Sequence, residues 1–181
     1  MEKFLVTNYS ISEVFVLKTK DRKTGIKSLM SHFNLADFAG KKVALKANFN
    51  SADPFPASTH LDTLQAVSEN LIEAKVSEVI MGERSGMGKT RQVLEEMSVL
   101  DLSRKVGFQT IVLDEISKDE WVKISHTGTH WIKGFYIAKL FTNADKVVQT
   151  CCLKAHRFGG HFTMSLKNSV GLVAKKVPGT L

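Results

Sequence analysis

Short runs of apolar residues along the chain predict the strands of a sheet. Residues 42–47 (KVALKA) alternate between apolar and polar positions, as a half-buried strand does, and residues 76–81 form a short apolar run. Residues 110–114 and 146–150 are rich in β-branched residues. We expect these four segments to share one central sheet. Residues 13–18 (EVFVLK) have a similar composition and predict a further strand.

Between these segments the apolar residues recur at helical spacing. Residues 61–74 place Leu61, Leu64, Val67 and Leu71 on one face of a helix, and residues 26–38 and 90–106 are further helical segments. Strands that alternate with helices predict an α/β fold, a three-layer sandwich with a largely parallel central sheet.

Residues 121–138 depart from this alternation because they are richer in Thr, aromatic residues and Gly. This composition indicates an antiparallel insertion or an antiparallel edge of the sheet.

The composition is that of an ordinary globular protein. The chain has 181 residues, of which 43% are hydrophobic and 24% are charged, so we expect a single α/β domain over residues 1–181. No segment approaches the roughly 18 apolar residues of a membrane span, and the first residues lack the layout of a signal peptide. We therefore expect a cytoplasmic protein without a membrane partner.

The charge and the cysteines narrow the candidate partners. The net charge is +7, but Lys and Arg are scattered rather than gathered into a basic tract, which disfavours nucleic acid and leaves anionic small molecules. Cys151 and Cys152 are adjacent, so on a strand they face opposite sides and suit neither a mutual disulfide nor a shared metal. We expect both to be reduced thiols.

A glycine-rich segment follows the predicted strand at residues 76–81. Residues 82–90 (GERSGMGKT) resemble a phosphate-binding loop, but five residues separate Gly82 from Gly88 where that loop needs four. Glu83 would also repel a phosphate. We expect a strand-to-helix loop whose amides remain one candidate wall of a ligand site.

Two histidines could contribute to a metal site. His156 and His161 are separated by a segment with two glycines, which let the chain reverse and bring the two rings together. Two histidines alone are a weak signal, and a third ligand would come from Glu83, Asp62 or His60.

Polar residues stand at the predicted strand ends and at the helix start that follows. In a parallel sheet the carboxyl ends of the strands meet along one edge, where ligands usually bind. The residues expected at this edge are Lys46, Asn48, His60, Gly82, Glu83, Lys154 and His156.

Several motifs along the chain, taken together and in order, carry a family resemblance. They are KKVALKANFNS at 41–51, the Thr-His pair and the Gly-Glu-Arg-Ser-Gly loop within 57–86, and CLKAHRFGGHFTMSLKNSVGLV at 152–173. In this order they resemble the family called domain of unknown function 362, over about residues 14–173. The last motif adds Lys167 and Asn168 to the candidate ligand-binding residues.

The resemblance implies little about the reaction. Some members of the family are joined to a ferredoxin-like iron–sulfur module, which implies redox or metal-linked chemistry for part of the family. A cluster needs four Cys ligands and this chain has two, so we expect no iron–sulfur cluster within it. Relatives often continue beyond the last motif, so two further alternatives are a fragment of a longer domain and a site completed by a second copy or a partner chain.

The candidate residues lead to a function hypothesis. Lys46, Lys154 and Lys167 in one crevice would repel one another, so an anionic small molecule of phosphate or carboxylate type is expected among them. Lys154 and Lys167 would bind the anion, and Asn48 and Asn168 would orient it.

His156, with Lys154, is the candidate catalytic group, acting as a base or, with His161 and Glu83, as a ligand of a divalent metal. Whether the protein is an enzyme stays open. The alternative is a non-catalytic module that docks a redox or nucleic-acid partner through its basic surface.

Overall fold

The fold is built around a parallel sheet of four strands. In the computed structural model, which describes residues 13–125, 133–155 and 160–178, the strand order is β3-β2-β1-β6. The strands are β1 (Lys42–Lys46), β2 (Glu78–Glu83), β3 (Gln109–Val112) and β6 (Lys146–Gln149). All three pairings are parallel, which confirms the predicted sheet and its four strands.

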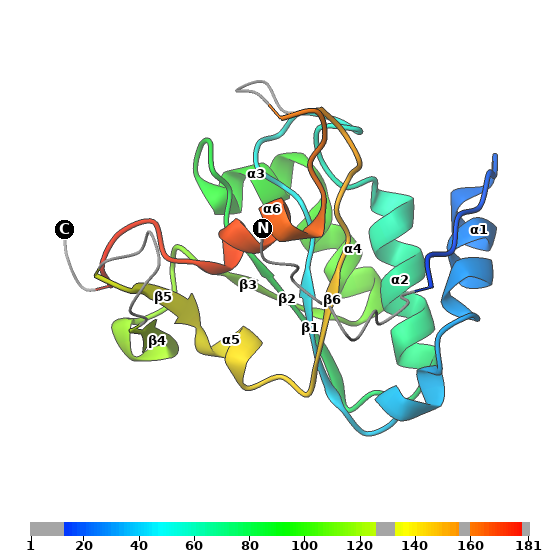
Figure 1. Cartoon of the computed structure of the whole chain (residues 1–181), viewed down its shortest axis with the longest axis horizontal. Helices are drawn as coiled ribbons and strands as arrows, with labels where there is room; N and C mark the ends of the chain where they lie inside the picture. The colour runs from blue at the N-terminus through cyan, green and yellow to red at the C-terminus, as the bar shows by residue number, and fades with distance from the viewer. Residues whose placement is uncertain (1–12, 126–132, 156–159, 179–181) are drawn as a thin grey trace, which may run out of the picture.

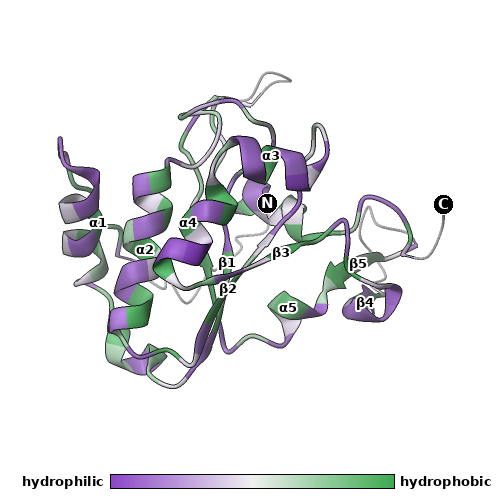
Figure 2. Ribbon diagram, turned by 180° about the vertical axis from the view of Figure 1, so that it is seen from behind, coloured by the Kyte–Doolittle hydropathy of each residue, from purple (hydrophilic) through white to green (hydrophobic). Residues whose placement is uncertain are grey.

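Helices cover both faces of the sheet (Figures 1 and 2). On one face lie α2 (Leu61–Glu73) and α4 (Val99–Val106), with α1 (Arg22–Met30) packed outside α2. A short 3-10 helix, η1 (Leu35–Phe38), leads into β1, and α3 (Thr90–Glu96) packs against α4.

The opposite face carries shorter elements, so the fold is the three-layer α/β sandwich that the sequence predicts. These are α5 (Lys139–Thr142), α6 (Ser165–Asn168) and the 3-10 helix η3 (Ser169–Leu172). Beside them β4 (Trp121–Ile124) pairs antiparallel with β5 (Phe135–Ala138) after the 3-10 helix η2 (Lys118–Glu120). This ribbon is the antiparallel insertion expected from residues 121–138.

Alternation along β1 divides the core between the two faces. Val43 and Leu45 pack with Leu64 and Leu71 of α2, whereas Ala44 packs on the other side with Phe141. Because successive side chains point to opposite faces, Lys46 follows Ala44 onto the face that carries η3. The end of β1 thus directs a long cationic side chain toward α6 and η3.

Two sequence predictions of secondary structure are wrong. Residues 90–106 form two helices instead of one, because Ser98 adopts a left-handed conformation (φ 55°) that separates α3 from α4. Residues 13–18 pair with no strand. Phe15 instead stacks on His32, with ring centroids 4.3 Å apart, and this places the segment beside α1 and away from both sheet edges (Figure 1).

The segment at 26–38 is helical only in part. It ends as α1 at Met30, passes through a turn, and resumes as η1. Among the described residues, no helix has both the length and the apolar character needed to cross a membrane.

Candidate functional site

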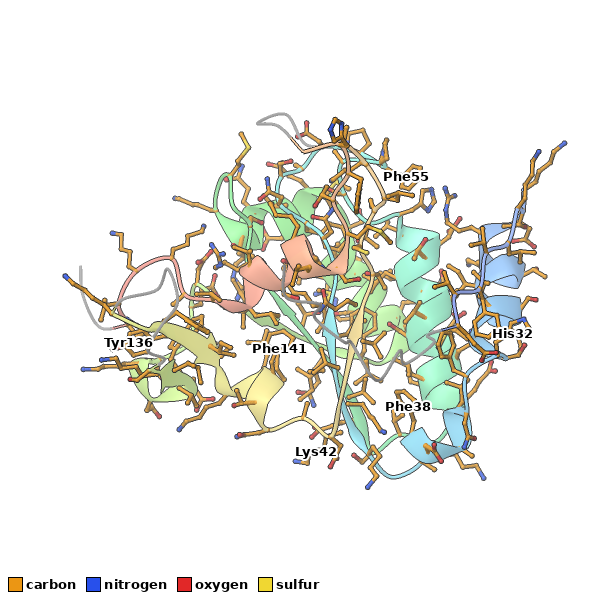
Figure 3. All side chains as sticks on the ribbon, in the orientation of Figure 1. His32, Phe38, Lys42, Phe55, Tyr136 and Phe141 are labelled. Carbon is orange, nitrogen blue, oxygen red and sulfur yellow. The ribbon has the colours of Figure 1, made fainter. Side chains whose placement is uncertain are left out.

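The carboxyl ends of the strands form the floor of a cavity, with α6 and η3 crossing in front of them (Figure 1). Figure 3 shows the two ends of the sheet, with Lys42 at the beginning of β1 and Phe55 in the loop beyond its other end. The cavity lies at the Phe55 end of the strands. Its volume is about 310 Å³, at the lower end of the range of roughly 300–1,000 Å³ for small-molecule sites.

A buried ion pair, Lys46 with Glu83, lies at the base of the cavity. The two side chains are 2% and 1% exposed, and Lys46 Nζ donates to Glu83 Oε1 and to the Ala47 carbonyl oxygen, 2.5 Å away. Glu83 Oε1 also accepts the Arg84 backbone N–H at 2.8 Å. Burial lowers the pKa of Lys46 and raises the pKa of Glu83, and the attraction between the two groups opposes both shifts.

Beside the ion pair at its base, the cavity has a wall formed by the loop between β1 and α2. Thr59 ties this loop to the sheet, because its hydroxyl accepts the Asn48 N–H at 2.9 Å and donates to the Thr150 carbonyl oxygen at 2.8 Å. Asn48 Nδ2 donates to the Ala57 carbonyl oxygen at 3.0 Å, and Lys154 Nζ donates to the same oxygen. This shared acceptor holds Lys154 beside Asn48.

Another wall is formed by residues that follow β6 and fold back over the cavity. Lys154 forms an antiparallel bridge with Thr163, and α6 and η3 follow. Asn168 Nδ2 lies 3.3 Å from both the Lys46 carbonyl oxygen and Gln149 Oε1, which fixes α6 to the ends of β1 and β6. These contacts bring Asn168 to the cavity and place Lys167 at its rim, where the side chain is exposed.

Gly171 of η3 lies directly over the Lys46 side chain. A Cβ at this position would stand 2.5 Å from Lys46 Cε and 3.0 Å from Nζ. Glycine is therefore required for η3 to approach the ammonium group so closely.

Most of the predicted site residues come together around this cavity. Its lining comprises Lys46, Asn48, Asn50, Glu83, Arg84, Gly86, Cys151, Cys152, Lys154, Thr163, Met164, Lys167, Asn168, Val170 and Gly171. Two of the predicted ligand-binding residues are elsewhere. His60 begins α2, where Nδ1 accepts the Asp62 N–H at 3.1 Å, and Gly82 faces Leu140 and Phe141 in the core.

The predicted metal ligands do not form a cluster in the part of the chain that the structure describes. His156 lies outside the described residues, His161 is exposed and does not line the cavity, and Glu83 is paired with Lys46. Within those limits no group of three His, Cys, Asp or Glu side chains is arranged to hold a metal ion.

The glycine-rich loop after β2 is held by internal contacts. The Gly86 N–H donates to Asn50 Oδ1 at 3.0 Å and the Met87 N–H donates to the Asn50 carbonyl oxygen at 3.0 Å. The Ser85 N–H donates to Thr90 Oγ1 at 2.9 Å. Three amides that a phosphate loop would turn toward its ligand are therefore already bonded to protein, and Asn50 accepts from two of them.

Two cavity residues of chemical interest escape the sequence interpretation. Arg84 lines the cavity and donates from Nη2 to the Val170 carbonyl oxygen at 2.9 Å, so it joins β2 to η3. Burial lowers its pKa, and the nearby Asp114 opposes this shift. The sequence position of Arg84, directly after Glu83 at the end of β2, could have indicated that it lies at the cavity.

Cys151 is the second cavity residue that the sequence interpretation does not identify. It lines the cavity with Sγ 3.3 Å from Ser165 Oγ, and both cysteines are free thiols as expected. Cys152 is more buried, and its Sγ donates to the Ser58 carbonyl oxygen at 3.3 Å.

Comparison with known proteins identifies a family. The model of the family described as Domain of unknown function (DUF362) matches residues 43–179, a range that contains every lining residue of the cavity. A search of curated proteins and a search of solved structures each found no match.

Proposed function

The chain belongs to the DUF362 family, and from this premise we propose that its cavity binds a small anion of phosphate or carboxylate type. The observation that carries the proposal is the charge of the lining. Among the described lining residues, Lys46, Arg84, Lys154 and Lys167 are cationic and Glu83 is the one carboxylate. Since Glu83 is paired with Lys46, three cationic side chains are left without a carboxylate of the cavity as partner.

Like charges that surround a partly enclosed space repel one another, and this repulsion raises the free energy of the empty site. Two unit charges 4 Å apart repel by about 1 kcal/mol in water and by several-fold more where the effective dielectric constant is lower. A bound phosphate or carboxylate replaces this repulsion with attraction and accepts charge-assisted hydrogen bonds from the same groups.

Each wall has a distinct part in this proposal. Lys154 and Lys167 bind the anion, and Arg84 adds a third positive charge. Asn48 and Asn168 use their amide hydrogens on backbone and side-chain oxygens, so they orient the walls that carry the lysines. The Lys46–Glu83 pair is the group positioned to exchange a proton with a bound molecule.

A metal-assisted reaction is a further part of the proposal. It would use His156 as a base or metal ligand, together with His161 and Glu83. Metal analysis of protein purified without a histidine tag or a chelator tests it. One equivalent of a divalent metal, lost on His156→Ala, supports metal assistance. Protein that carries no metal as purified and takes up none from added divalent metal salts contradicts it.

The alternative function is a non-catalytic module in the cytoplasm that docks a redox or nucleic-acid partner, or a second copy of the chain. Exposed apolar side chains beside the cavity, Leu153, Phe162 and Leu166, favour a protein partner. Salt distinguishes the two functions, because docking through scattered surface lysines weakens steeply with ionic strength and an enclosed anion site weakens less.

Titration calorimetry with inorganic phosphate and with acetate tests the proposal. We expect one site per chain and a loss of about tenfold in affinity on Lys154→Ala or Lys167→Ala, the scale of one charged hydrogen bond. Lys105→Ala, which removes an exposed lysine of α4 far from the lining, is the matched control. If neither anion binds, or if Lys154→Ala weakens binding no more than Lys105→Ala, the proposal is wrong.

A further inference from the structure

The buried ion pair beside the cavity has hydrogen-bonding capacity that the protein leaves unused. Glu83 Oε1 accepts two hydrogen bonds, from Lys46 and from Arg84, whereas Glu83 Oε2 is buried and has no hydrogen-bond partner in the described part of the chain. The Phe49 backbone N–H also lowers the pKa of this carboxyl group, but its geometry does not meet the requirements of a hydrogen bond to Oε2.

Lys46 is incompletely satisfied as well. An ammonium group has three N–H donors, and among the described residues Lys46 Nζ has two acceptors, Ala47 O and Glu83 Oε1. A buried polar atom without a partner costs free energy that a ligand or a bound water can recover. Both residues are among those that line the cavity, although their side chains are only 2% and 1% exposed.

The chemistry of these two groups defines what fits between them. A carboxylate oxygen only accepts and an ammonium group only donates, so a single group that satisfies both must donate one hydrogen bond and accept another. A hydroxyl group does this. An ionised phosphate or carboxylate oxygen does not, because it has no proton to give and Glu83 repels it.

We propose that the ligand is a hydroxylated anion whose hydroxyl group donates to Glu83 Oε2 and accepts from Lys46 Nζ, while Arg84, Lys154 and Lys167 bind its charged end. This inference rests on the proposed function and narrows the ligand class to hydroxy acids and phosphorylated alcohols. Gly171 makes the inference testable, because a side chain at this position would stand 3.0 Å from Lys46 Nζ and would compete with a ligand for that group.

Matched pairs of small anions test the inference on the full chain. The first pair is 2-hydroxyethyl phosphate and ethyl phosphate, and the second is lactate and propionate. Within each pair the charge is equal and one hydroxyl differs. We expect the hydroxylated member of one pair to bind the wild-type protein at least about tenfold more tightly, as one recovered hydrogen bond to a charged group provides.

Two variants locate the hydroxyl group. Glu83→Gln replaces the acceptor at Oε2 with a donor, and Gly171→Ala puts a methyl group beside Lys46 Nζ. Both should bind the two members of the pair with equal affinity. Glu83→Gln removes half of a buried pair and can unfold the protein. Gly171→Ala keeps the pair and needs no left-handed backbone angle, but its Cβ would lie 2.5 Å from Lys46 Cε. The comparison is therefore made with whichever variant keeps the circular dichroism spectrum of the wild-type protein and its affinity for the member of the pair that lacks the hydroxyl group.

The outcomes separate the two proposals. If every anion fails to bind, the proposed function and this inference are both wrong. If both members of each pair bind equally well to the wild-type protein, the anion site stands, a water satisfies Glu83, and the hydroxyl inference is overturned. A hydroxyl preference that survives in Gly171→Ala also overturns the inference, because the hydroxyl group then lies elsewhere.

Discussion

Removing one member of the Lys46–Glu83 pair should destabilise the protein far more than removing an exposed ion pair. Lys46→Met keeps an unbranched side chain in the same space but leaves Glu83, 0% exposed, without its cation. The loss of one partner of a buried pair costs about 3–5 kcal/mol. The matched control is Lys27→Met, since the Lys27–Glu73 pair is 67% and 62% exposed at 3.3 Å and should contribute about 0–1 kcal/mol.

Urea unfolding followed by circular dichroism measures both variants. The double variant Lys46→Met with Glu83→Gln should recover much of the lost stability, because no unpaired charge is then buried. If Lys46→Met lowers the free energy of unfolding no more than Lys27→Met does, the buried pair does not stabilise the fold as argued.

The pH dependence of the two single variants should have opposite signs. In Lys46→Met, burial raises the pKa of Glu83 above its value in the unfolded chain, so the folded state holds a proton that the unfolded state has lost. Stability relative to wild type therefore falls as pH rises from about 4.5. In Glu83→Gln, burial lowers the pKa of Lys46, so stability rises with pH up to about 10.5. Two slopes of the same sign would refute this reasoning.

Two further predictions concern other residues of the sheet edge. Iodoacetamide should alkylate half-buried Cys151 before buried Cys152, and phosphate should slow the reaction at Cys151; peptide mass spectrometry measures both rates. Equal alkylation rates at the two thiols, or a rate at Cys151 that phosphate does not change, would contradict the assigned positions. Gly82→Ala should destabilise the fold by about 1–3 kcal/mol in urea, because a Cβ would lie 2.6 Å from Leu140 Cδ2 and 2.8 Å from Phe141 Cζ; an unchanged midpoint would show that this packing yields easily.

The sheet was predictable because its strands have a local signal. The apolar runs that became β1, β2, β3 and β6 are bounded by polar loops, and their alternation with helices fixes a parallel arrangement. Residues 13–18 have the same local signal and form no strand, because pairing also requires a free sheet edge within reach, and Phe15 is held against α1 by His32.

The candidate site was predictable where it depends on strand ends. Lys46, Glu83 and Lys154 meet because parallel strands end along one edge. Arg84 and Cys151 were missed, since their place in the lining depends on how α6 and η3 fold back over the sheet, which no local pattern encodes. The sequence position of His60, directly after Thr59, predicts a place in the site, but its ring caps α2 instead.

A crystal structure of the protein grown with inorganic phosphate tests the central proposal most directly. We expect one phosphate in the cavity, within hydrogen-bond distance of Lys154 Nζ and of at least one of Arg84 and Lys167, and its loss from crystals of Lys154→Ala grown in the same solution. A cavity that holds only water at saturating phosphate, with Lys154 and Lys167 turned to solvent, would contradict the proposal that this sheet edge is an anion-binding site.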